Sequence, residues 1–139
     1  MRAAKAQVGD RIGAVSFVLT RADLRRYATA SGDHNPIHLD EEAAKAAGLP
    51  GVIAHGMLTM GQVIWPLVEW AGGDPGAIRE YTVRFARPVV VPADGGAELT
   101  VEGQVTAVAG SRVTVALAVT ASGQKVLGKA QAVIELPAA

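Results

Sequence analysis

Residues 57–70, with the sequence MLTMGQVIWPLVEW, form the longest apolar run of this 139-residue chain. Apolar side chains recur in it at the spacing of a helix that is buried on most of its surface. We expect this helix to begin near His55 and Gly56. Pro66 lies well inside the run, and because proline lacks an amide hydrogen it should kink the helix or end its regular part near Trp65.

The residues after this helix have the pattern of strands. Residues 72–76 (GGDPG) predict a break, and then Tyr81, Val83 and Phe85 alternate with small or polar residues, as in a strand with one buried face. Three further strand-like runs are separated by turns short enough for antiparallel hairpins: residues 98–108, 112–121 and 125–136. One long buried helix followed by consecutive antiparallel strands predicts a single α+β domain over residues 1–139, with the sheet wrapped around the helix.

The chain before the central helix predicts one strand and two shorter helices. Residues 15–19 are typical of a strand, and Gly13 before them is typical of a turn. A helix over residues 21–30 should follow, and a second helix over residues 41–47. Residues 89–91 lie between two prolines, which indicates an edge or entry segment of the sheet.

Both short helices carry capping signals. Thr20 and Asp23 approximate a capping box for the first helix. Asp40 should cap the second helix and Gly48 should end it. Three arginines of the first helix are expected on a solvated face, with binding of an acidic partner or a phosphate group as the alternative: Arg21, Arg25 and Arg26.

Composition excludes several classes of function. The chain has 13 basic and 13 acidic residues, so nothing in its net charge predicts nucleic acid or an anionic membrane as a partner. It has no cysteine, which rules out disulfides and thiol chemistry. The apolar run is too short and too mixed to span a bilayer, and the first residues show no apolar segment of a signal peptide. We therefore expect a cytoplasmic protein.

Residues 30–40 (ASGDHNPIHLD) place a carboxylate and an imidazole in a loop that cannot be helical throughout. Pro36 disfavours helical backbone at the residue before it, and Gly32 allows a sharp turn. Local side-chain hydrogen bonds should make the loop rigid, so that Asp33 and His38 can converge on one point. A histidine beside a carboxylate can move protons near neutral pH. The alternative is a surface turn that precedes a helix cap.

The glycine at the start of the central helix is the second half of the candidate site. The first amides of a helix lack intrahelical acceptors and carry partial positive charge. Because Gly56 has no side chain, a substrate carbonyl oxygen that gains negative charge during a reaction could approach its N–H closely. The alternative is a glycine that is needed only for tight packing.

Residues 31–38 (SGDHNPIH), followed by residues 54–57 (AHGM), resemble the MaoC-like dehydratases, which are (R)-specific enoyl-thioester hydratases of the hot-dog fold. Residues 54–61 (AHGMLTMG), 73–77 (GDPGA) and 80–85 (EYTVRF) are similar to one branch of that family. This branch comprises the catalytic subunits of actinobacterial (3R)-hydroxyacyl-ACP dehydratases, which act in fatty-acid elongation for mycolic acids. The similarity runs over most of the chain.

The resemblance implies a hydro-lyase that adds water reversibly to a trans-2-enoyl-CoA or -ACP and needs no cofactor or metal. Asp33 and His38 would hold one water and share the proton transfers, with the formal base left open, and Gly56 would donate its amide to the thioester carbonyl. Other residues would support the loop (Ser31, Asn35, Pro36) or contact the substrate (His55, Met57). A homodimer, or a heterodimer with a related hot-dog subunit, is implied as well. Acyl-chain length, CoA or ACP preference and physiological direction stay open.

Other interpretations of the same residues compete with this one. His34 and His38 have the spacing that zinc-binding helices use, but Pro36 argues against a helix there, so we expect no metal and a solvent-facing His34. His55 could instead be a capping or packing residue. An acyl-thioesterase of the same fold would usually carry an acidic residue on or near the central helix, and residues 56–60 (GMLTM) contain none. A subunit that binds acyl thioesters without turnover is the remaining alternative.

Overall fold

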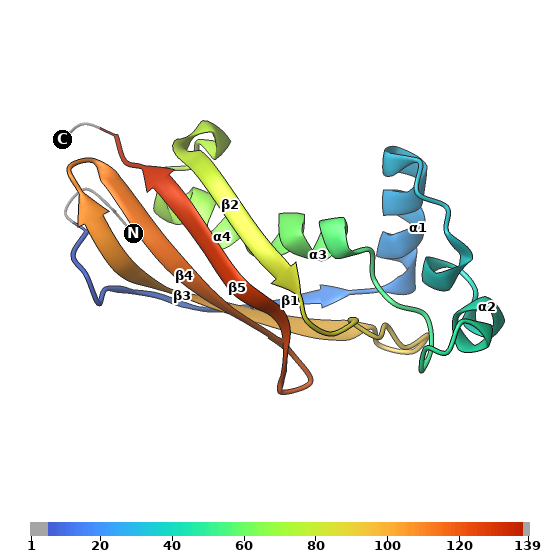
Figure 1. Ribbon diagram of the computed structural model, residues 1–139. Coiled ribbons are helices and arrows are strands. Elements are labelled where there is room, and N and C mark those ends of the chain that lie inside the picture. The colour runs from blue at the N-terminus through green and yellow to red at the C-terminus, as the bar shows by residue number, and fades with distance from the viewer. Residues whose placement is uncertain (1–5, 138–139) are drawn as a thin grey trace.

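The computed structural model describes residues 6–137, which form an antiparallel sheet with helices along one face and beyond one end (Figure 1). The strands lie in the order β1-β3-β4-β5-β2. They are β1 (Arg11–Leu19), β2 (Ile78–Phe85), β3 (Ala97–Ala109), β4 (Arg112–Ala121) and β5 (Gln124–Glu135). The helices are α1 (Arg21–Ser31), α2 (Glu41–Ala46), α3 (Gly56–Val63) and α4 (Trp65–Trp70), with short 3-10 helices η1 (Pro36–His38) and η2 (Pro75–Ala77).

The apolar core lies between the sheet and the helices α3 and α4, which run along one face of the sheet in Figure 1. Leu99, Val115 and Ile134 of the central strands are 0% exposed, and so are Val63 of α3 and Leu67 of α4. Burying each side chain of this size stabilises the fold by ~1.5–3 kcal/mol. The predicted α+β architecture, a hot-dog sheet around a central helix, is confirmed.

The central helix is broken where the sequence predicts. It divides at Ile64 into α3 and α4, and Pro66 lies in the first turn of α4, where its missing amide hydrogen costs no helical hydrogen bond. The expected burial on most of its surface is wrong, because Met57 is 62% exposed and Trp65 is 48% exposed. The sheet covers only one side of these helices. None of the helices within residues 6–137 has the length and hydropathy of a membrane span.

The caps of the two short helices are confirmed. The Thr20 hydroxyl accepts from the N–H of Asp23 at 3.2 Å, and the Asp23 carboxylate accepts from the N–H of Thr20 at 2.8 Å. The Asp40 carboxylate accepts from the N–H of Glu42 at 3.1 Å. Since these bonds satisfy amides that the helices leave free, they fix where α1 and α2 begin.

Two segments of the sheet differ from their predictions. Strand β1 begins before Val15, and Gly13 lies inside it at a register shift opposite β3, so the turn expected at Gly13 is wrong. A glycine inside a strand often marks a bulge, so the residue type alone does not distinguish a bulge from a turn. Residues 89–91 pair with residues 52–54 through a single bridge, Ile53 with Val90. They are therefore an entry segment beside α3 and form no edge strand of the sheet.

Candidate active site

The loop between α1 and η1 is held by successive side-chain hydrogen bonds. Gly32 ends α1 with a φ of 80°, a conformation that favours glycine. The Ser31 hydroxyl accepts from the N–H of Asp33 at 3.1 Å, and the Asp33 carboxylate accepts from the N–H of Asn35 at 3.2 Å. The Asn35 side chain then accepts from the N–H of Ile37 at 3.2 Å. The bend is therefore fixed by local chemistry, as its sequence predicts, and Pro36 opens η1.

His38 lies at the end of η1, and a backbone carbonyl determines which of its ring nitrogens bears a hydrogen. It is 8% exposed, and its Nδ1 lies 2.7 Å from the carbonyl oxygen of Ile53. Because a carbonyl only accepts, Nδ1 carries a hydrogen, and when the ring carries one proton its Nε2 is the acceptor nitrogen. A base in this form can take a proton from a water molecule.

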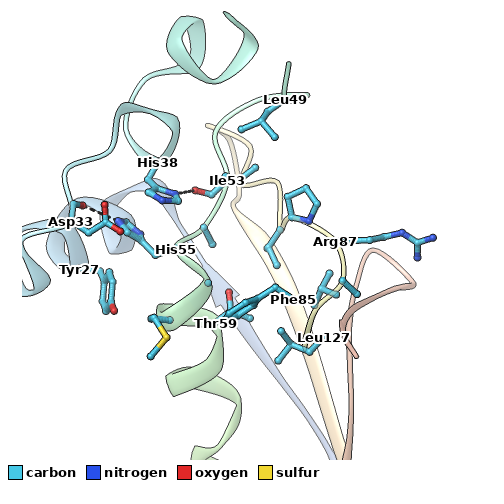
Figure 2. Close-up of a pocket in the computed structure, with 17 residues that line it drawn as sticks. Tyr27, Asp33, His38, Leu49, Ile53, His55, Thr59, Phe85, Arg87 and Leu127 are labelled. Carbon is cyan, nitrogen blue, oxygen red and sulfur yellow. Dashed lines mark hydrogen bonds between the residues drawn. The ribbon is translucent and has the colours of Figure 1, made fainter. Parts of the chain in front are cut away.

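Asp33, His38 and His55 form one cluster (Figure 2). One side-chain oxygen or nitrogen of each lies within 4.8 Å of those of the other two. A water that hydrogen-bonds to two groups can join atoms up to about 5.6 Å apart, so the Asp33 carboxylate and His38 are close enough for one water to bridge them. The candidate acid–base pair thus converges as the loop predicts.

The same cluster is poorly arranged for a metal ion. The rings of His38 and His55 are stacked, with centroids 3.9 Å apart and an interplanar angle of 23°. A zinc ion lies in the plane of each coordinating imidazole at about 2.0–2.1 Å from nitrogen, and two nearly parallel rings cannot both meet this condition. His34 is exposed, as the sequence predicts.

His55 is buried behind the loop. It is 2% exposed, and its Nε2–H donates to the backbone carbonyl of Asp33 at 3.1 Å. Tyr27 packs edge-on against its ring, with centroids 4.7 Å apart. Burial lowers the pKa of His55 below its ordinary value. Its side chain makes no capping hydrogen bond to α3, so the ring acts in packing and in the contact with Asp33.

Gly56 is the first residue of α3 and packs against an aromatic ring. The first amides of a helix have no intrahelical acceptor. The side chain of His55, the residue before Gly56, accepts no hydrogen bond from them. A Cβ on Gly56 would lie 2.9 Å from Cε1 of Phe85. The geometry therefore agrees with both interpretations of this glycine, an accessible amide donor and a site of close packing.

A cavity of about 580 Å³ joins the acid–base pair to the start of α3 (Figure 2). Asp33, His38, His55, Gly56 and Met57, all predicted from the sequence, line it. Most of the remaining wall is apolar, which suits an acyl chain. Asp33 is exposed and Met57 is 62% exposed, so the cavity is open at this rim.

Sequence reasoning did not identify most of the cavity wall, and Tyr27, Thr59 and Phe85 are among the residues that it missed. Thr59 is 2% exposed and lies one turn after Gly56. A polar side chain at this spacing in an otherwise apolar helix is a signal that could have identified it. Tyr27 comes from α1 and Phe85 from β2, and no local pattern connects either residue with the loop.

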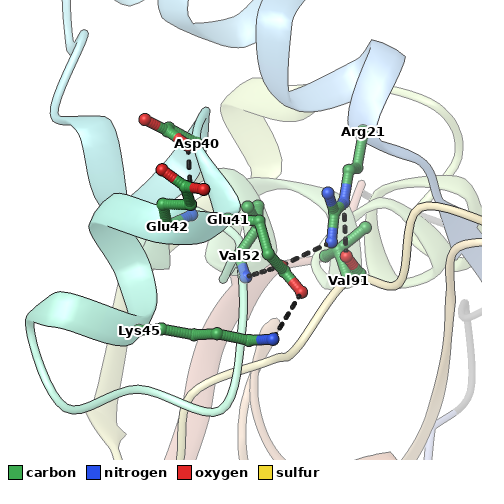
Figure 3. A network of polar contacts seen from close by, with 7 residues as sticks. All are labelled: Arg21, Asp40, Glu41, Glu42, Lys45, Val52 and Val91. Carbon is green, nitrogen blue, oxygen red and sulfur yellow. Dashed lines mark hydrogen bonds and ion pairs between the residues drawn. The ribbon is translucent and has the colours of Figure 1, made fainter.

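A polar network ties α1 and α2 to the chain that leads into the site (Figure 3). Arg21 donates to the carbonyl of Val91 at 2.9 Å and to the Glu41 carboxylate at 2.8 Å. Glu41 also accepts from the N–H of Val52 at 3.1 Å and pairs with Lys45 at 3.6 Å. The backbone bond from Val52, followed by the Arg21 guanidinium, lowers the pKa of Glu41. The solvated face expected for Arg21 is wrong, because its guanidinium satisfies a carbonyl from a distant segment.

Comparison with known proteins agrees with the resemblance. A family model of the MaoC like domain matches residues 4–123. The Mycobacterium tuberculosis protein named 3-hydroxyacyl-thioester dehydratase X is 51% identical over 78 residues, which are 56% of this chain and 26% of that protein. A solved MaoC-like dehydratase has a TM-score of 0.91 at 42% identity, covering 95% of this chain and 41% of that chain. The solved (R)-hydratase from A. caviae involved in PHA biosynthesis has a TM-score of 0.78 at 29% identity, covering 95% and 98%.

These matches differ in how much of each relative they include. The aligned part of this chain spans about a quarter of the dehydratase from M. tuberculosis and less than half of the solved MaoC-like dehydratase. It spans nearly all of the (R)-hydratase chain. The family model, in contrast, matches well over half of this chain, including the loop and the start of α3. The chain belongs to the MaoC-like domain family.

Proposed function

We propose that this chain catalyses the reversible addition of water to a trans-2-enoyl thioester, carried on CoA or an acyl carrier protein, and forms a (3R)-3-hydroxyacyl thioester. One observation carries the proposal: a single, largely apolar cavity joins Asp33 and His38 to the amide end of α3. The similarity to an (R)-hydratase over nearly the full length of both chains supports the same stereochemistry.

The reaction needs a base for the water, a proton for the α-carbon and a donor for the enolate oxygen, and we assign all three roles to residues of the cavity. A water between the Asp33 carboxylate and Nε2 of His38 gives one proton to this pair, while its oxygen bonds to the β-carbon. The electron pair of the double bond moves toward the thioester carbonyl, whose oxygen becomes an enolate next to the N–H of Gly56. A proton from the pair then bonds to the α-carbon on the same face, so that hydrogen and hydroxyl are both added. Dehydration is the reverse sequence.

We propose that a second hot-dog unit completes the site. Strand β2 lies at an edge of the sheet, and its last residue, Phe85, is 54% exposed. Asp33 and Met57 are exposed at the same cavity. The solved MaoC-like dehydratase chain is more than twice as long as the part that this chain covers, which leaves room for such a unit within one chain. For this chain, the second unit would be either another copy of the same chain or a related hot-dog subunit.

The assay uses purified protein and trans-2-enoyl-CoA substrates of increasing chain length, each also as the acyl carrier protein thioester. We expect loss of the conjugated enoyl absorbance, a (3R) product in chiral chromatography, and equal rates before and after chelation of metals with EDTA. Size-exclusion chromatography with activity measured on each fraction distinguishes a homodimer from a chain that needs another subunit. Free thiol release without hydration would favour a thioesterase, and saturable binding without turnover would favour a binding subunit. Either result would overturn the proposal.

A further inference from the structure

His55 contacts both members of the proposed catalytic pair, Asp33 and His38. Its Nε2–H donates to the backbone carbonyl of Asp33 at 3.1 Å, and its ring stacks on that of His38 at a centroid distance of 3.9 Å. The two residues that must share one water are thus both in contact with a third, buried side chain. In Figure 2 the rings of His38 and His55 lie side by side next to the Asp33 backbone.

The surroundings of His55 favour one protonation state. Nδ1 has no hydrogen-bond partner among the described residues and is buried. A second proton, on Nδ1, would therefore be buried without an acceptor among the described residues, which costs free energy. The titratable groups that face His55 are Asp33 from the loop, His38 from η1 and Tyr27 from α1. Burial lowers the pKa of His55 and outweighs the hydrogen bond to the Asp33 carbonyl, which raises it.

We infer that His55 is a positioning residue of the proposed hydratase, and that it acts as a neutral imidazole. Its N–H holds the Asp33 backbone, and its ring sets the plane in which His38 presents Nε2. This role rests on the proposed function and differs from the substrate contact that the sequence predicts. A displacement of about 1 Å between catalytic groups can lower a rate about 10²-fold, so a residue without contact to the thioester can still govern kcat.

Two substitutions separate the parts of this role. His55→Gln can place an amide N–H near the position of Nε2 but removes the ring, and His55→Phe keeps a ring but removes the donor. We expect kcat to fall by less than about tenfold in His55→Gln and by about 10²-fold in His55→Phe, with KM within threefold of wild type in both. His34→Gln, in the exposed part of the loop, is the matched control and should leave both constants within about twofold. Melting curves establish that each variant is folded.

The kinetic outcomes that overturn the inference are distinct. A tenfold rise in KM at unchanged kcat would make His55 a substrate contact. Equal kcat values in folded His55→Gln and His55→Phe would show that the hydrogen bond from the His55 N–H to Asp33 does not affect the rate.

A second measurement does not depend on activity. The chain has three histidines, so their ring nitrogens can be resolved in a ¹⁵N NMR spectrum and assigned by substitution. We expect the Nε2–H tautomer of neutral His55 at pH 7 and at pH 6, where an unfolded reference in urea is largely protonated. A protonated ring or an Nδ1–H tautomer in the folded chain would overturn the inference. If the wild-type protein hydrates no enoyl thioester, the proposed function fails, and this spectrum still decides the state of His55.

Discussion

Adding a methyl group at Gly56 separates the two roles that this glycine could have. A Cβ there would lie 2.9 Å from Cε1 of Phe85, whereas ordinary contacts begin near 3.4 Å, so the ring must retreat by about 0.5 Å. Phe85 is 54% exposed, so the rest of this chain does not enclose its ring. Gly56 does not have a positive φ, so alanine fits the backbone. We expect the free energy of unfolding of Gly56→Ala to change by less than ~1 kcal/mol.

The effect of Gly56→Ala on activity should be much larger. The methyl group would stand beside the N–H that we propose for the thioester carbonyl, and loss of one oxyanion donor lowers kcat by ~10²–10³-fold. We therefore expect kcat/KM of Gly56→Ala on a trans-2-enoyl-CoA to fall by about 10²-fold, while urea unfolding stays near that of wild type.

A double variant decides between the donor and the packing role. Phe85→Leu removes the ring atoms that the new Cβ would meet, so it relieves the close contact without restoring access to the amide. If Gly56 serves the carbonyl, Gly56→Ala combined with Phe85→Leu remains as slow as Gly56→Ala alone. Recovery of the double variant to the rate of Phe85→Leu alone would refute the amide donor and leave a glycine selected for packing.

Two further predictions concern the polar contacts that support the loop. Arg21→Met should lower the free energy of unfolding by about 1–3 kcal/mol, because charge-assisted hydrogen bonds to a carbonyl and a carboxylate are lost. Arg25→Met, at an exposed position, is the control and should change the free energy of unfolding by less than ~0.5 kcal/mol. Equal losses for the two variants in urea unfolding would contradict the network. Backbone N–H groups lower the pKa values of Asp23 and Glu41 in the fold. The two carboxylates therefore stabilise the fold at a pH above their pKa values in the unfolded chain, ~3.9 and ~4.3. This stabilisation is lost as the pH falls through their lower pKa values in the folded chain. Glu41→Gln should therefore make the free energy of unfolding depend less on pH between about 5 and 3, and an unchanged dependence would count against this assignment.

The parts of the fold that follow from the sequence rest on interactions within a few residues. The hydroxyl of Thr20 and the carboxylate of Asp23 meet because the first turn of a helix brings them together. Gly32 takes a left-handed conformation at the end of α1, and Pro36 forces the backbone to open η1. The bend that brings Asp33 toward His38 is encoded in this short segment, which is why the candidate pair could be named before the fold was known.

Contacts between distant segments have no such local signal. Arg21 reaches the carbonyl of Val91, 70 residues away, and the ring of Phe85 lies against Gly56 only because β2 ends beside α3. Helical periodicity likewise identifies apolar residues without showing whether anything covers them. Met57 is apolar by pattern and 62% exposed in the structure, since the sheet of one chain packs against only one side of α3.

The central claim is that Asp33 and His38 act on the same water, and a double-mutant cycle tests it most directly. Initial rates on a trans-2-enoyl-CoA are measured for Asp33→Asn, His38→Gln, the double variant, and His34→Gln as the control in the same loop. We predict that each single substitution lowers kcat by at least ~10²-fold, and that the double variant lies within about tenfold of the slower single variant because both groups serve one proton transfer. Single variants within tenfold of wild type, or losses that multiply in the double variant, would contradict a shared water.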